Sequence, residues 1–219
     1  MDSISWHLRM LRHMAVATLL TALTGAWGVR GAAPGVGPAG CTGGQACAAT
    51  LEGQDFADTA VLSERTLRLN GLGLRGVAWI KAFVAGLYLP APTRDSVQVL
   101  TMPGPKRLRL KIMLDAPSHE LTKSLTSRIA RNETEAAQAQ MEERLSHLAG
   151  HLDSMGELHV GDTVDIDFMP ERGIVLRLNE RPVGTPVAGE DLYRSVLKIF
   201  VGDRPVDKRL KEGLLRGGV

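Results

Sequence analysis

Apolar and polar positions in the middle of this 219-residue chain follow the patterns of β-strands. Residues 66–70 alternate, which predicts a strand. Residues 77–89 are apolar on both faces with Lys81 as the only charge, which predicts a strand inside a covered sheet. Residues 106–114 alternate between charged and apolar, which predicts a strand with one face toward solvent. The glycine-rich residues 71–76 predict a turn or a bulge.

Helices are expected both before and after the third of these strands in the sequence. A short helix is expected before it, over residues 95–100. After it, Ser118 is expected to cap a helix whose apolar side is Leu121, Leu125 and Ile129. A longer helix begins at Asn132 or Thr134. Its apolar stripe consists of Met141, Leu145, Leu148 and Leu152.

The last third of the chain predicts a hairpin, an edge strand and two helices. Residues 163–168 and Gly173–Leu178 form the hairpin, and Arg181–Val187 adds the edge strand. The helices span residues 191–200 and 206–215. Because strands come in runs and helices come in runs, the fold class is α+β, with a mainly antiparallel sheet covered by helices.

The first residues have the order of a secretory signal peptide. Arg9 and Arg12 precede an apolar run, and small residues follow it. We expect residues 1–32 to be a signal peptide cleaved between Arg30 and Pro34, which makes the mature protein periplasmic or secreted. An uncleaved membrane anchor is the alternative, because the run is close to the minimum length of a span.

Composition divides the rest of the chain in two. Residues 33–54 are rich in Gly, Ala, Pro and Thr without an apolar period, so they predict a flexible leader. Residues 55–219 are then one domain. Cys41 and Cys47 lie in the leader, and in an oxidising compartment we expect them to form a disulfide. A redox pair or a lipid-anchored Cys41 are the alternatives, each with a poor match to its motif.

Charge argues against two classes of partner. The whole chain has a formal net charge of +2, from 26 basic and 24 acidic residues. Cleavage removes three arginines and one aspartate, which leaves 23 of each sign. A neutral protein with mixed charges does not match nucleic acid or an anionic membrane surface as its main partner. Membrane association therefore has no support in the sequence, which also predicts no oligomeric state.

Two motifs point to cofactor or metal chemistry without the context that each requires. The glycines of residues 71–76 match a dinucleotide fingerprint, but a strand follows them where that site needs a helix. His147 and His151 are four residues apart on a predicted helix, the spacing of two zinc ligands. They lack a third ligand, so a solvated helix flank is expected. We therefore predict no cofactor and no metal.

Three segments carry a resemblance to a known family. Residues 71–76 read GLGLRG, residues 86–89 read GLYL, and residues 201–215 read VGDRPVDKRLKEGLL. Together they resemble the chalcone isomerase-like superfamily, and its bacterial exported branch in particular. The resemblance covers residues 63–219. It implies an open-faced sandwich of a sheet and helices, in which Arg75 is aimed into a cleft.

Arg75 is the strongest candidate for a functional residue. A guanidinium in an apolar run needs an anionic partner, either in a structural ion pair or on a ligand. The resemblance implies that the matching arginine stabilises a phenolate in the isomerases and holds a carboxylate in the fatty-acid-binding members. Gly76 is a further candidate ligand contact. Tyr88 is either a second polar contact or a core residue.

The residues that accompany this arginine in the isomerases do not carry over. The corresponding positions hold Leu121, Ser124, Arg128 and Phe83. Catalytic residues are therefore unknown, and the expected function is non-catalytic binding of a small amphipathic carboxylate such as a fatty acid. The alternatives are an isomerase, or intramolecular lyase, that acts on an enone-like substrate, and a periplasmic scaffold that binds no ligand.

Overall fold

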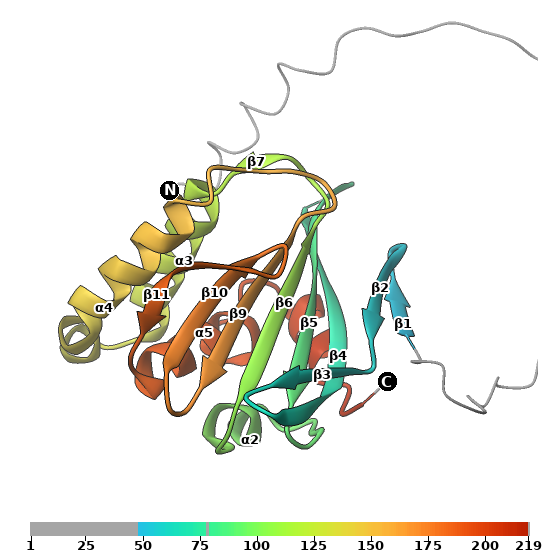
Figure 1. Cartoon of the computed structure of the whole chain (residues 1–219), viewed down its shortest axis with the longest axis horizontal. Helices are drawn as coiled ribbons and strands as arrows, with labels where there is room; N and C mark the ends of the chain where they lie inside the picture. The colour runs from blue at the N-terminus through green and yellow to red at the C-terminus, as the bar shows by residue number, and fades with distance from the viewer. Residues whose placement is uncertain (1–47, 78, 219) are drawn as a thin grey trace, which may run out of the picture. The chain divides into compact units, whose positions relative to one another are not determined.

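The computed structural model describes residues 48–77 and 79–218, which form a curled antiparallel sheet covered by helices (Figure 1). Seven strands are arranged in the order β11-β10-β9-β6-β5-β4-β3. Their bounds are β3 Thr59–Leu62, β4 Arg65–Val77, β5 Ile80–Leu89, β6 Lys106–Ile112, β9 Thr163–Met169, β10 Gly173–Leu178 and β11 Arg181–Val187. Every neighbouring pair is antiparallel. The α+β class, the hairpin and the edge strand are confirmed.

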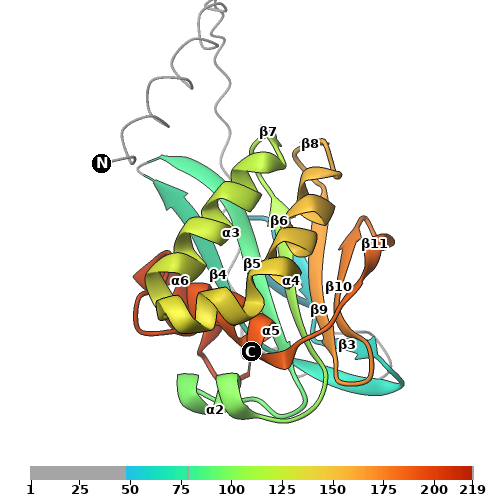
Figure 2. The same ribbon diagram turned by 90° about the vertical axis from the view of Figure 1, so that its left-hand side faces the viewer.

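Five helices are described, and their layer lies on one side of the sheet (Figure 2). They are α2 Ser96–Thr101, α3 His119–Asn132, α4 Glu135–Asp153, α5 Glu190–Val201 and α6 Lys208–Leu214. Thr134, one of the two expected starts of α4, caps that helix by accepting a hydrogen bond from the Ala137 amide. Ser118 is the N-cap residue of α3, as expected, but its hydroxyl makes no capping hydrogen bond and donates to the carbonyl of Asp153 instead.

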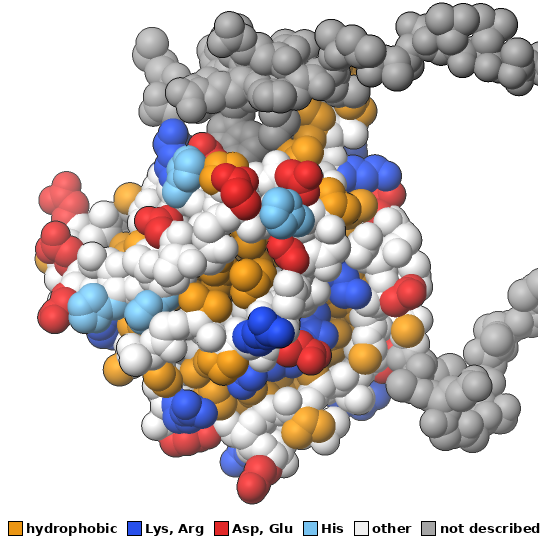
Figure 3. All heavy atoms as spheres, turned by 45° about the horizontal axis from the view of Figure 1, so that its top comes forward, with side chains coloured by type: hydrophobic (Ala, Val, Ile, Leu, Met, Phe, Trp, Pro, Cys, Tyr) orange, Lys and Arg blue, Asp and Glu red, His pale blue; other side chains and the backbone are white. Residues whose placement is uncertain are grey.

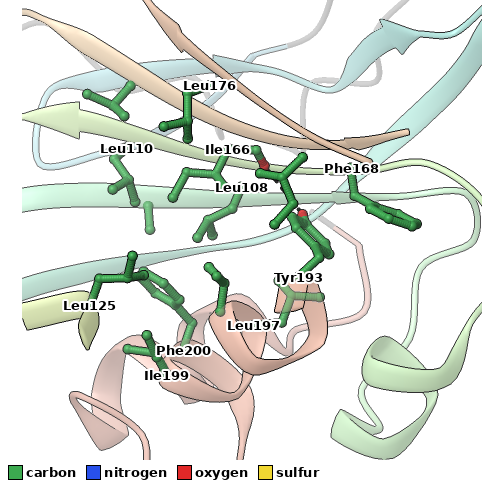
Figure 4. Close-up of a cluster of buried hydrophobic side chains, with 14 of the residues drawn as sticks. Leu108, Leu110, Leu125, Ile166, Phe168, Leu176, Tyr193, Leu197, Ile199 and Phe200 are labelled. Carbon is green, nitrogen blue, oxygen red and sulfur yellow. Dashed lines mark hydrogen bonds between the residues drawn. The ribbon is translucent and has the colours of Figure 1, made fainter. Parts of the chain in front are cut away.

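The helix face of the sheet, defined by Ala85, Leu87 and Leu89 of β5, carries the larger core. In Figure 4, Leu110 and Ile166 point from the sheet toward Phe200 of α5. The expected apolar sides of α3 and α4 belong to this core, with Ile129 and Leu148 almost fully buried. Removing a large side chain here costs about 2–5 kcal/mol.

The outer face of the sheet, defined by Val84 and Tyr88 of β5, is also covered. Phe56 lies over Gly86, where a Cβ would come 2.7 Å from its ring. The prediction that one face of β6 meets solvent is therefore wrong, because Arg107 on that face is only 8% exposed. Its partner Asp167 is fully buried, so the strand pairs its charges instead of exposing them.

The glycine-rich residues 71–76 continue β4 and do not form a turn. The register of the β4–β5 ladder shifts between Leu69 and Gly71 and again between Arg75 and Gly76, which are β-bulges. Leu69 before the first bulge and Leu72 after it both pack in the outer core. The extra residue, Asn70, thus lets odd-numbered residues beyond it face the helices.

Two short pairs of strands complete the fold. β7 Ala116–Pro117 pairs with β8 Glu157–Leu158, and β1 Ala48–Leu51 pairs with β2 Gln54–Ala57. The second pair begins inside the segment expected to be a flexible leader. The predicted signal peptide, Cys41 and Cys47 lie outside the described residues.

The surface carries charges of both signs. Figure 3 shows acidic and basic side chains interspersed on one face, with apolar side chains between them. Within the part of the chain that the structure describes, no helix is long and apolar enough to cross a membrane.

Candidate functional site

A small cavity lies between the helix face of the sheet and the helices α3, α4 and α5. Its volume is about 60 Å³. Phe83 of β5 and Leu121 and Ser124 of α3 line it, together with Arg75 of β4. Figure 4 shows Leu125, Ile199 and Phe200, which also line it, gathered at one end of the core. Arg75, Phe83, Leu121 and Ser124, all named from the sequence, therefore meet at one site.

Among the described residues, Arg75 is the only charged one that lines this cavity. Its side chain is 25% exposed. One guanidinium nitrogen, Nη1, donates to Oδ2 of Asp207 at 3.2 Å and to the carbonyl of Gly76 at 3.4 Å. A guanidinium has five N–H donors, so its other nitrogens remain available to an anion. Arg75 thus takes part in an ion pair and also faces an apolar cavity.

Asp207 has two tasks at this site. It is the N-cap residue of α6, where its Oδ1 accepts hydrogen bonds from the amides of Arg209 and Leu210 at 2.8 and 3.1 Å. Its other oxygen, Oδ2, binds Arg75. The start of α6 therefore holds the guanidinium at the edge of the cavity, which sequence reasoning did not identify because the two residues are 132 positions apart.

Arg128 adds positive charge beside Arg75. It lies on α3, one turn beyond Ser124. Burial, followed by the charges of Arg131 and Arg75, lowers the pKa of Arg128. Asp207 is already paired with Arg75, so this end of the site has more positive than negative charge.

Tyr88 lies on the opposite face of the sheet from Arg75, and the structure does not bring the two together. It is fully buried in the outer core, and its hydroxyl donates to the carbonyl of Ala57 at 3.0 Å. Burial raises the pKa of Tyr88 to about 12. Of the two interpretations of this residue, the structure supports the core residue.

A second cluster of charges, missed by the sequence analysis, crosses the outer face. Arg107 binds Asp167 through two hydrogen bonds of 2.6 and 2.7 Å, and Arg109 binds Asp165 through two of 2.7 and 2.8 Å. Burial lowers the pKa of Arg107, but the hydrogen bonds and charge of Asp167 outweigh it and raise the pKa above its ordinary value. The alternating arginines and aspartates on β6 and β9 were a signal that could have identified these pairs.

A shallow pocket of about 440 Å³ opens at one end of the outer face. Ser63 and Glu64 of the β3–β4 turn line it, with Glu171 and Arg177 across from them. Arg177 is bound to Asp167 at 3.2 Å, so it belongs to the cluster of ion pairs on this face. None of the predicted site residues lies there.

The two histidines on α4 do not form a metal site in the structure. His147 is exposed, and His151 packs against Gly184 of β11. Among residues 48–77 and 79–218, no three His, Cys, Asp or Glu side chains are grouped so that they could hold a metal ion.

Comparisons with known proteins identify the family of this fold. The sequence model described as chalcone isomerase-like matches residues 48–216. Among solved structures, the chain is similar to a fatty-acid binding protein from Arabidopsis thaliana, with a TM-score of 0.61 and 18% sequence identity. The match covers 77% of this chain and 96% of that one. No curated protein matches the sequence.

Proposed function

This chain belongs to the chalcone isomerase-like family, and we propose that it binds a small amphipathic carboxylate, with the carboxylate at Arg75 and the apolar part between the sheet and α3–α5. The observation that carries the proposal is the lining of the cavity, in which Arg75 is the single charge among apolar side chains. A charge-assisted contact at the edge of an apolar space is what such a ligand requires.

The similarity to a plant fatty-acid binding protein supports the same class of ligand. It concerns the fold alone at 18% identity, so the choice of ligand rests on the residues of this cavity. Within the described part of the chain, Arg75 supplies the only guanidinium of the lining and Ser124 the only hydroxyl.

The size of the cavity sets a condition on the ligand. A volume of about 60 Å³ holds about two water molecules, at roughly 30 Å³ each. A longer acyl chain therefore has to displace side chains of the lining. Phe83 and Leu121 are only partly buried at the edge of the core, so their displacement disturbs less packing than that of a fully buried residue.

Calorimetric titration with saturated carboxylates from butyrate to palmitate tests this proposal. We expect saturable binding that Arg75→Ala weakens by at least about 30-fold, or about 2 kcal/mol. Arg68→Ala is the matched control, because Arg68 is an exposed arginine at the other end of the same strand. Absence of binding across the series, with folded protein, would favour a scaffold without a ligand.

A further inference from the structure

We propose that the head group accepted at this site is a phosphate monoester, held by Arg75, Arg128 and Arg131, so that the ligand is a single-chain lipid phosphate. The inference rests on the proposed function, because the acyl chain enters the same cavity. It keeps the apolar cavity and Arg75 as the anchor, and it replaces the singly charged carboxylate of that proposal with a doubly charged head group as the preferred ligand.

The first argument is the position of the arginines along α3. Leu121, Ser124 and Leu125 of this helix line the cavity. Arg128 follows Ser124 by four residues and Leu125 by three, so it lies on the same side of the helix, one turn further on. Arg131 follows after another three. A ligand whose chain lies along Leu121 and Ser124 therefore presents its head group to these side chains.

The second argument is the balance of charge. Arg128 lies within electrostatic reach of Arg131 on one side and of Arg75 on the other, so it links the two guanidiniums. Asp207, bound to Arg75 at 3.2 Å, supplies one negative charge. Glu133 at the end of α3 is already bound to Lys198 and Ser195.

The charges of neighbouring residues do not cancel the excess of positive charge at Arg75, Arg128 and Arg131. Arg204 joins the cluster through a hydrogen bond of 3.0 Å from its Nη1 to the carbonyl of Arg131. Arg204 and its neighbour Asp203 add one charge of each sign. Three arginines against Asp207 leave two positive charges unanswered. A phosphate monoester carries about −1.5 to −2 at neutral pH, whereas a carboxylate carries only one charge.

The third argument concerns the geometry of the donors. Arg75 uses Nη1 for Asp207 and Gly76, and its other N–H groups have no hydrogen-bond partner among the residues that the structure describes, so they can donate to a ligand oxygen. Arginine forks match the oxygens of a phosphate, and three phosphate oxygens can accept from three side chains at once. A dianion also offsets both the cost of burying the Arg128 charge and its repulsion from Arg131 and Arg75.

The test compares ligands that share one palmitoyl chain. Palmitate, lysophosphatidic acid and lysophosphatidylcholine are titrated into the full domain by calorimetry, and inorganic phosphate is titrated alone. We expect lysophosphatidic acid to bind at least about 10-fold more tightly than palmitate, from one added charge-assisted contact. Lysophosphatidylcholine, whose head group has no net charge, should lose this advantage. Inorganic phosphate should bind weakly.

Variants assign the preference to the arginines. Arg128→Gln and Arg131→Gln should each weaken lysophosphatidic acid binding about 5- to 10-fold more than they weaken palmitate binding, because a dianion gains more from each guanidinium than a single charge does. Lys123→Gln is the control, an exposed basic residue of the same helix. Denaturant midpoints show whether each variant is folded, and Arg131→Gln, an exposed position, keeps the test valid if Arg128→Gln is unstable.

Each outcome decides a different point. Equal affinity for palmitate and lysophosphatidic acid would overturn the phosphate head group and leave the proposed function intact. Inorganic phosphate that binds as tightly as the lipid, with the same dependence on the arginines, would overturn the lipid and show free phosphate to be the ligand. Absence of binding by both lipids would overturn the lipid phosphate, and absence of binding by the shorter carboxylates too would overturn the proposed function as well.

Discussion

Gly71 of β4 and Gly213 of α6 meet with only backbone between them. A Cβ on Gly71 would overlap the carbonyl oxygen of Gly213, and a Cβ on Gly213 would come within 2.9 Å of the Cα of Gly73. The glycines near Arg75 therefore allow a helix to dock closely, which is a structural reason for the pattern that resembles a dinucleotide fingerprint. Because Asp207 is the N-cap residue of α6, the same contact fixes the residue that holds Arg75.

We expect Gly71→Ala to destabilise the protein by about 1–3 kcal/mol or more, because the added methyl group forces α6 away from the sheet. The measurement is the free energy of unfolding in denaturant. Gly150→Ala is the control: Gly150 lies in α4 with no atom near its missing Cβ, so alanine there should stabilise by up to about 1 kcal/mol. A Gly71→Ala variant as stable as the wild type would show that α6 can shift without cost.

The sequence predicts those parts of the fold that depend on local periodicity. The strand β5, the β9–β10 hairpin and the helix α4 could all be identified because burial imposes a period of about 2 or 3.6 on neighbouring residues. A bulge is one of two alternatives for residues 71–76, and the sequence does not predict the position of the first bulge at Asn70, inside the expected strand. The side chain of Asn70 is held by the carbonyl of Leu214 and the amide of Thr93, both distant in sequence.

The candidate site was predictable to the same limited extent. Arg75 could be found because a charge in an apolar run is unusual, and Phe83, Leu121 and Ser124 were located through the family resemblance. The contact between Arg75 and Asp207 depends on how α6 docks, which no local pattern records. Tyr88 could not be assigned to a face, because β5 is apolar on both sides and its alternation carries no signal.

Breaking the buried ion pair of Arg107 and Asp167 should cost more unfolding free energy than breaking an exposed pair of the same geometry. Asp167→Ala leaves two arginines, Arg107 and Arg177, without their carboxylate, and we expect a loss of about 3–5 kcal/mol in unfolding free energy. Asp191→Ala removes a similar two-bond contact to Arg144, but Asp191 is 50% exposed, so about 1 kcal/mol or less is expected. Equal losses would show that burial does not set the cost.

Tyrosine ionisation should report unfolding at alkaline pH. The chain has two tyrosines, and burial raises the pKa of both, to about 12 for Tyr88 from an ordinary value of 10.0. The folded state therefore retains protons that the unfolded state loses, so stability is full below pH 10 and falls as the pH rises from 10 toward 12. Ultraviolet titration should show tyrosinate forming together with loss of structure. Ionisation near pH 10 in folded protein would contradict the burial of these hydroxyls.

Export remains a prediction from the sequence, and we propose that the mature chain begins between Arg30 and Pro34 with a disulfide between Cys41 and Cys47. The intact mass of protein taken from the periplasm should equal that of the cleaved chain less two hydrogens. Alkylation without prior reduction is the control for free thiols. Retention of the apolar residues 14–29, or two alkylated cysteines, would contradict the proposal.

The substitution Asp207→Asn separates the two roles of Asp207, which caps α6 and pairs with Arg75. Asparagine caps a helix about as well as aspartate, so the start of α6 and the stability of the fold should change by less than about 1 kcal/mol. The substitution removes the negative charge that competes with a ligand for Arg75, so affinity for an anionic ligand should rise by about 3- to 10-fold. Asp207→Ala should lose the cap as well, at a cost of about 0.5–2 kcal/mol in stability. The measurements are carboxylate titration by calorimetry and the denaturant midpoint of each variant. If Arg75 holds only Asp207, affinity will not rise in Asp207→Asn, whereas a gain that vanishes in the double variant with Arg75→Ala would assign the anion to this guanidinium.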